Sequence, residues 1–157
     1  MSFRMRSMAN TFTSLHFHIV FSTKNRDRWI RPEMEEDLWR YLGGICRRHQ
    51  ITAVQIGGVD DHVHLLLGVP PTLALSDVVK RLKGESSKWM STEVKGMKGF
   101  AWQDGYGAFT VGKSQIADTV RYIQTQREHH AKVSFEDEYR KFLHIHEIQA
   151  DEKYIFG

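Results

Sequence analysis

Asp60-Asp61-His62-Val63-His64-Leu65-Leu66-Leu67 joins a tight turn to a strand, and the rest of the expected topology follows from it. Side chains alternate between the two faces of a strand, so His62 and His64 point to one face while Val63 and Leu65 point to the other. Residues 51–59, before the turn, also have the pattern of a strand. The sequence therefore predicts a pair of strands joined at the two aspartates, with two histidines on one face.

The elements on either side of this pair complete a regular order. Residues 15–22 alternate apolar and polar and predict a strand, and Pro32 with the glutamates after it starts a helix to about residue 49. Further along we expect a helix at 76–94, a fourth strand region at 100–111, and helices at 115–131 and 134–143. This is the α+β, ferredoxin-like βαββαβ order: an antiparallel sheet with helices on one face, followed by C-terminal helices. The other sheet face is expected to be free for a ligand or a partner subunit.

Length and composition place limits on the class of protein. The 157 residues suit one core, and we expect a flexible N-terminal extension at 1–12 and a single domain at 13–157. No apolar run is long enough to cross a membrane, and the first residues do not have the pattern of a signal peptide. The single Cys46 excludes an intrachain disulfide and indicates a reducing cytoplasm.

The charge balance permits a polyanion partner without requiring one. There are 22 Lys and Arg against 19 Asp and Glu, for a net charge of +3. Lys24, Arg26 and Arg28 surround Trp29, and cations bind phosphates while bases stack on aromatic rings. We therefore expect nucleic-acid contacts there, against the alternative that these charges form an ordinary solvated face.

His-apolar-His occurs three times, and only one copy has favourable surroundings. In the pair at 144 and 146 the side chains diverge by roughly 200° on a helix and cannot chelate one ion together. The pair at 16 and 18 either chelates or lies beside the second pair on the same sheet face. The pair at 62 and 64 follows Asp61, which can orient an imidazole or add an oxygen ligand.

A second polar group lies about sixty residues later. Tyr122 and Gln126 are four residues apart and share one face of the expected helix, beside its apolar stripe. A tyrosine there either covers the edge of the core or performs chemistry. His129 and His130 follow, as ligands, as proton shuttles or as cations suited to the end of a helix. Two imidazoles, an amide oxygen and a phenol are able to converge on a divalent metal and a phosphate, which suggests strand cleavage by tyrosine attack.

Four segments together resemble one family, the small single-tyrosine HUH transposases of the insertion-sequence two-hundred/six-hundred-and-five group. The resemblance runs from about residue 13 to the C-terminus and rests on residues 18–24, 61–66, 102–109 and 122–126, the last followed by two histidines. Several motifs in the correct order are far more specific than any one of them.

The resemblance implies roles for particular residues. His62 and His64 match the metal-binding pair, Gln126 the third ligand of Mg²⁺ or Mn²⁺, and Tyr122 the nucleophile that forms a 5′-phosphotyrosine link with single-stranded DNA. It also implies recognition of DNA hairpins and a homodimer with composite active sites. Gly107 and the Gly112-Lys113 link are candidates to give the tyrosine helix the freedom that such an arrangement needs. We add Lys113 to the candidate DNA contacts.

Other functions remain open at this point. A domesticated relative acting on palindromes, or a replication initiator, would use the same chemistry. A non-catalytic single-stranded nucleic-acid-binding module would use the sheet alone, and a metal hydrolase would use water in place of tyrosine.

Overall fold

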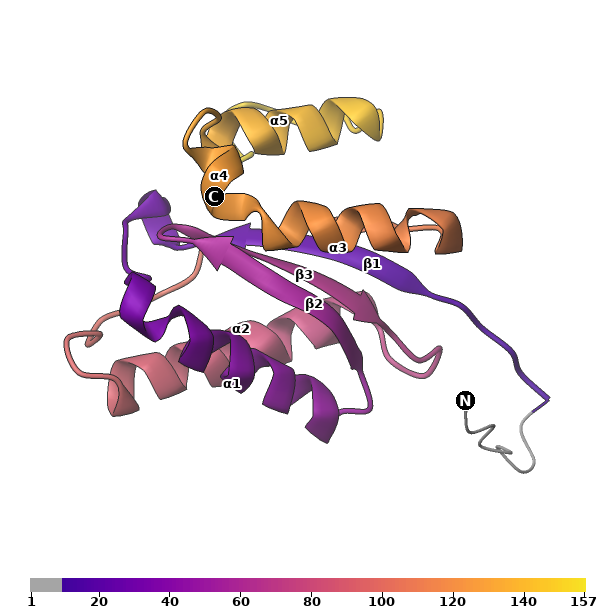
Figure 1. Ribbon diagram of the computed structural model, residues 1–157, viewed down its shortest axis with the longest axis horizontal. Helices are drawn as coiled ribbons and strands as arrows, with labels where there is room; N and C mark the ends of the chain where they lie inside the picture. Colours follow the sequence, from indigo (N-terminus) through magenta and orange to yellow (C-terminus); the bar gives the residue numbers. More distant parts are fainter. Residues whose placement is uncertain (1–9) are drawn as a thin grey trace.

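The structure is a computed structural model that describes residues 10–157 (Figure 1). Residues 1–9 of the expected N-terminal extension lie outside the described residues, and residues 10–15 have no regular secondary structure. No helix of the described part is both long and apolar enough to cross a membrane.

Four antiparallel strands form the central sheet. They are β1 (His16–Ser22), β2 (Thr52–Val59), β3 (His62–Gly68) and β4 (Gly107–Thr110), in the order β2-β3-β1-β4. Helix α1 (Glu35–Arg48) connects β1 to β2, and α2 (Leu75–Glu93) connects β3 to β4. This order and these directions confirm the predicted ferredoxin-like βαββαβ arrangement.

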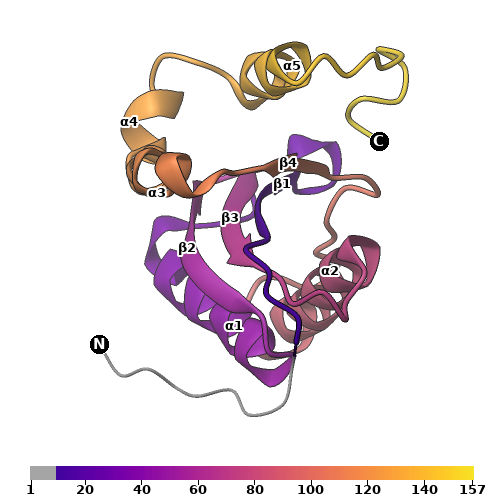
Figure 2. The same ribbon diagram turned by 90° about the vertical axis from the view of Figure 1, so that its right-hand side faces the viewer.

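One face of the sheet carries the main hydrophobic core. Helices α1 and α2 cover this face (Figure 2). The strands contribute fully buried side chains at alternating positions, Ile19 and Phe21 from β1 and Val63, Leu65 and Leu67 from β3. Burial of each such side chain stabilises the fold by about 1.5–3 kcal/mol.

The opposite face is covered as well, which corrects the expectation of a free face. Helices α3 (Ile116–Gln124), α4 (Gln126–His130) and α5 (Phe135–Ile145) lie over it (Figure 2). A smaller apolar cluster forms there from Val20, Phe109, Phe135 and Tyr139. Helices α3 and α5 need this contact because each has an apolar stripe that must leave water.

The predicted helix at 115–131 is broken in two. A 3-10 turn at Lys113–Gln115 precedes α3, and Thr125, with φ −104° and ψ 24°, separates α3 from α4. The hydroxyl of Thr125 donates to the Arg121 carbonyl at 3.0 Å, a local bond that competes with regular helix geometry. The break turns α4 so that Gln126 is buried.

The fourth strand is shorter than predicted. Only 107–110 pairs as a strand, although Trp102 makes an isolated bridge to Thr23. Lys83 of α2 donates to the carbonyl oxygens of Gln103, Asp104 and Gly105, at 2.7, 3.2 and 2.5 Å. The ammonium group of this lysine therefore fixes the loop before β4.

Glycine at position 57 of β2 allows α3 to approach the sheet. Gly57 is paired with His64 and lies on the same sheet face. A Cβ atom there would lie 2.9 Å from both Cγ2 and the carbonyl oxygen of Ile123, closer than real contacts allow. Because one of these atoms is backbone, a side chain at this position would have to push the helix away.

We expect Gly57→Ala to lower the free energy of unfolding by about 1–3 kcal/mol, since overpacking forces the α3 backbone to move. Gly84→Ala is the control: a Cβ at that position in α2 meets nothing within 4 Å, and alanine in a helix should add about 0.5–1 kcal/mol. Urea denaturation measures both. Equal stability of Gly57→Ala and the parent would show that α3 does not pack this closely.

Candidate active site

A cluster of polar side chains lies buried between the sheet and the C-terminal helices. Strand β3 supplies His62 and His64, and β1 supplies His18 beside them. Tyr122 comes from α3, Gln126, His129 and His130 from α4, and Glu138 from α5. His62 and His64 have no exposed surface, and Glu138 is 3% exposed. Burial of so many polar groups is costly unless they satisfy one another or bind a ligand.

His62 is fixed through its Nδ1 nitrogen. Its Nδ1–H donates to Oδ1 of Asp61 at 2.7 Å, so Nε2 presents a lone pair to the cluster. Nε2 faces Oε1 of Gln126 at 3.4 Å and Oε1 of Glu138 at 3.6 Å. Burial acts to raise the pKa of Asp61, but the contact with His62 outweighs it and the net shift is downward.

His64 is a neutral imidazole at physiological pH. Burial lowers its pKa to about 4, although the bond to Glu138 opposes this shift. Its Nε2 lies 3.0 Å from Oε1 of Glu138, and its Nδ1 lies 2.7 Å from Nε2 of His18. Burial, and then the neighbouring His64, lower the pKa of His18 to about 3. The His18–His64 pair therefore shares one proton through a hydrogen bond and carries no charge.

Glu138 is the group that sequence reasoning missed. Its carboxylate contacts His64 through Oε1, and through Oε2 it contacts His129 and His130, each at 3.1 Å. Burial acts to raise its pKa, but the bonds from His130 and His64 outweigh this and hold the pKa well below its usual range. A signal was present in the sequence: Glu138 occupies an apolar-stripe position between the buried Phe135 and Tyr139.

Tyr122 reaches the same cluster from α3. Its hydroxyl donates to Oε2 of Glu138 and lies 3.3 Å from Nε2 of His129. Burial, followed by the negative charge of Glu138, raises the pKa of Tyr122 far above its usual value, so the phenol is protonated at neutral pH. The side chain also lines a cavity of about 540 Å³ between α3, β4 and α5, so it remains accessible from outside.

The donor set fits a divalent ion. His62, His64, His130 and Glu138 each offer one ligand atom, and these atoms lie within 4.8 Å of one another. The amide oxygen of Gln126 faces the same space. Imidazole nitrogens together with carboxylate and amide oxygens suit Mn²⁺ well and Mg²⁺ acceptably.

The remaining histidines of the other two pairs lie outside the cluster, because only His18 joins it. His16 is paired with Gly68, further along the same sheet face as His18. His144 is exposed at the end of α5, and His146 stacks on Phe109 with ring centroids 4.7 Å apart. The prediction that the pair at 144 and 146 cannot chelate one ion agrees with these positions.

Of the four candidate DNA contacts, two border a basic hollow next to the cluster. Arg26 and Arg28 line it together with Arg127, Lys132 and His130, and with three acids, Asp60, Asp61 and Glu136. Arg26 is held by Glu136 of α5 at 2.6 Å, whereas Arg28 is exposed. Lys24 is exposed in the 3-10 turn Lys24–Arg26, and Lys113 is exposed before α3, outside this hollow.

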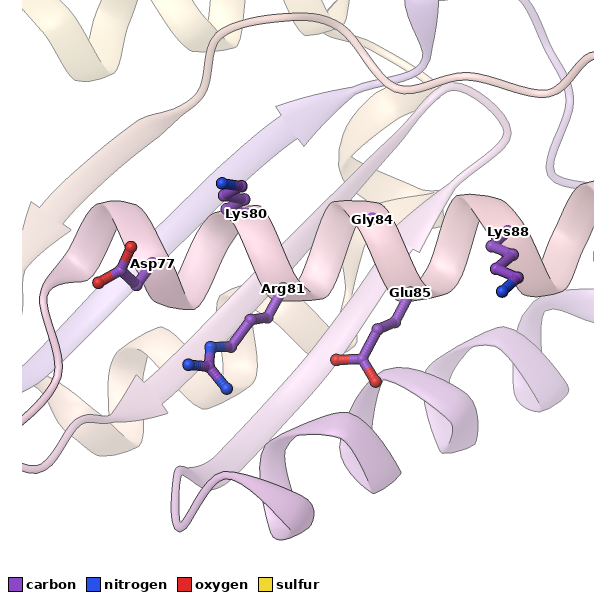
Figure 3. A pocket seen from close by; sticks show the side chains of 6 residues that line it. All are labelled: Asp77, Lys80, Arg81, Gly84, Glu85 and Lys88. Carbon is purple, nitrogen blue, oxygen red and sulfur yellow. The ribbon is translucent and has the colours of Figure 1, made fainter.

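A second charged hollow lies on the outer surface of α2 and belongs to a different part of the molecule (Figure 3). Its cations are offset by acids: Glu85 pairs with Arg48 at 2.8 Å, and Arg81 donates to His49. Because α2 covers the sheet face opposite the histidines, this hollow has no part in the candidate site.

Comparison with known proteins identifies relatives over most of the chain. The family model described as "Transposase IS200 like" matches residues 11–126. The ISDra2 transposase TnpA of Deinococcus radiodurans is 29% identical over 119 residues, which are 73% of this chain and 85% of that protein. The transposase for insertion sequence element IS200 of Salmonella typhimurium is 30% identical over 129 residues, 78% of this chain and 84% of that protein.

Solved structures share the fold. A putative transposase from Deinococcus radiodurans R1 has a TM-score of 0.62 at 28% identity, covering 78% of this chain and 98% of its own. A REP-associated tyrosine transposase bound to a REP hairpin has a TM-score of 0.60 at 13% identity, covering 82% of this chain and 76% of its own. The family match ends at Gln126, so His129, His130 and Glu138 lie beyond it.

The buried His18 predicts a pH dependence of stability. Burial lowers its pKa from 6.5, the ordinary value for histidine, to about 3 in the folded protein. As the pH falls below 6.5, the unfolded chain takes up a proton that folded His18 does not, so stability is lost on acidification, by on the order of 2 kcal/mol at about pH 5. His18→Gln should therefore reduce the loss of stability between about pH 7.5 and 5 in urea denaturation.

The exposed His144 supplies the control, because His144→Gln should leave that pH dependence as it is. If His18→Gln and His144→Gln show the same dependence as the parent, His18 is not held neutral by the fold.

Proposed function

This chain belongs to the IS200-like transposase family, and on that basis we propose that it cleaves and rejoins single-stranded DNA with Tyr122 as nucleophile, assisted by a divalent ion at His62, His64 and Gln126. One observation supports this most directly. The phenol of Tyr122 and the imidazole of His64 lie in one buried cluster, with ring centroids 5.7 Å apart, although their helix and strand are far apart in sequence.

The proposed step exchanges one phosphodiester bond for another. The Tyr122 oxygen forms a bond to phosphorus, the bond from phosphorus to the 3′ oxygen breaks, and the phenolic proton ends on the released 3′ hydroxyl. A bound Mg²⁺ or Mn²⁺ would withdraw charge from the phosphate in the transition state. Rejoining reverses these changes, so no ATP is needed.

The side chains around Tyr122 address its main deficiency as a nucleophile. A protonated phenol is weak at neutral pH and must lose its proton as it attacks. Glu138 and His129 both contact the hydroxyl and orient it. A non-catalytic binding module would give no role to this buried arrangement, whose desolvation is costly.

The DNA path and the assembly complete the proposal. Arg26 and Arg28 are proposed to bind phosphates at the basic hollow, and Lys24 and Lys113 to bind DNA further out. Hairpin ends are the proposed substrate, since a fold neighbour is bound to a REP hairpin.

We retain the homodimer as a proposal. We also retain the cytoplasm as the location of the protein, where Cys46 stays reduced. In the single chain, Tyr122 lies beside His64 of the same protomer.

Tyr122→Phe should abolish the covalent protein–DNA adduct and strand cleavage, because the attacking oxygen is lost, and leave hairpin affinity essentially unchanged, because the phosphate contacts remain. Cleavage of an end-containing single strand in Mn²⁺, followed by gel analysis of the adduct, measures the first effect. Tyr154→Phe, at an exposed tyrosine, is the control and should cleave normally. Adduct formation by Tyr122→Phe would exclude Tyr122 as the nucleophile.

Arg28→Gln should weaken single-stranded DNA binding and reduce the slope of log affinity against log salt by about 0.7, the value for one lost phosphate contact. Arg40→Gln is matched to it, because Arg40 is exposed on α1, across the sheet from the cluster. Fluorescence anisotropy over a salt series gives both slopes. Identical slopes for Arg28→Gln and Arg40→Gln would place the DNA elsewhere.

A further inference from the structure

Glu138 is a buried carboxylate beyond the part of the chain that the family model matches. We propose that its Oε1 is a direct ligand of the divalent ion, so that α5 completes a metal site that residues 11–126 alone leave open. This inference rests on the proposed function for the presence of an ion at His62 and His64, and it adds a ligand of a different chemical class to the two imidazoles and one amide.

The donor atoms are spaced like neighbouring ligands of one ion. Oε1 of Glu138 lies 3.0 Å from Nε2 of His64 and 3.6 Å from Nε2 of His62. The same Nε2 atom of His62 lies 3.4 Å from Oε1 of Gln126. Ligands at right angles with bonds of about 2.1 Å are separated by about 3.0 Å, and wider angles give somewhat larger separations. The four atoms therefore need little movement to share an ion.

The hydrogen-bond roles leave a position for a cation between these atoms. Because the Nδ1–H of His62 donates to Asp61, its Nε2 has only a lone pair to offer. The carboxylate oxygen Oε1 of Glu138 likewise offers only lone pairs. Two acceptors that face each other across 3.6 Å gain nothing from that contact, and an ion between them would satisfy both.

The second carboxylate oxygen is held by side chains other than the strand histidines. Oε2 accepts a hydrogen bond from the Tyr122 hydroxyl, and Nε2 of His129 and Nε2 of His130 each lie 3.1 Å from it. His130 is itself fixed, because its Nδ1–H donates to the carbonyl of Val133 at 2.7 Å. The carboxylate is thus oriented from one side by α3 and α4, with Oε1 directed at the strand histidines.

The chemistry of this set suits a hard ion and a phosphate substrate. A carboxylate adds a negative charge and an oxygen donor. This ligand set therefore binds Mg²⁺ and Mn²⁺ more favourably than a set of neutral ligands alone would. With His62, His64, Gln126 and Glu138 bound, two positions of an octahedral ion remain for phosphate oxygens.

Isothermal titration calorimetry of the whole chain with MnCl₂, without DNA, measures the affinity for Mn²⁺ and tests the inference. Glu138→Gln should weaken Mn²⁺ binding by at least about tenfold, since even supporting residues around a metal contribute that much. Asp137→Asn is the control. It removes a carboxylate from the preceding position of α5, which is exposed, and should bind Mn²⁺ as the parent does. Glu138→Asp keeps the charge on a shorter side chain and should show intermediate affinity.

The same titration of His62→Ala separates this inference from the proposed function. If Glu138→Gln binds Mn²⁺ like the parent while His62→Ala loses binding, Glu138 is not a ligand and the proposed metal site remains. If both variants bind like the parent, the ion is not at this site and the two proposals fail together. Circular dichroism establishes that each variant is folded, and if Glu138→Gln is not, parental affinity of Glu138→Asp overturns the inference.

Discussion

The pairing of β1 with β3 is the constraint on which the rest of the structure depends. In this register Val20 lies opposite His64 and Ser22 opposite His62, so the imidazoles share one face while the intervening apolar side chains share the other. A shift of one residue would exchange the two faces, moving the core side chains of β3 under the C-terminal helices and the histidines under α1 and α2. The apolar core therefore fixes the position of the histidines as firmly as it fixes the sheet.

The histidine face is stabilised by compensation among its own polar groups. Burial keeps the imidazoles of His18 and His64 neutral, and a hydrogen bond joins them. Glu138 keeps its charge because hydrogen bonds from His130 and His64 outweigh the cost of burial. Such a network is stable only when each member has a partner, so removal of one group leaves others unsatisfied. The chain thus retains a polar interior that a purely structural role would not require.

Local rules predicted the fold and half of the cluster. Alternation in a strand placed His62 and His64 on one face, and the spacing of four residues placed Tyr122 and Gln126 on adjacent turns, now the end of α3 and the start of α4. The helix break between them was not predicted, because amphipathic spacing continues through Thr125 and the local hydroxyl bond is not visible in that pattern.

Glu138 was missed for a related reason, and its position explains how the site is divided along the chain. An acid near the start of a helix is normally accounted for by the helix dipole, so it gives no separate signal. Its partners come from β3, α3 and α4, which only tertiary packing brings to α5. The family-matched residues supply the imidazole pair, the amide and the phenol, while the segment after Gln126 supplies the one carboxylate buried among the described residues. Because that carboxylate contacts both the phenol and His64, α5 is structurally part of the site and more than a cover over the sheet.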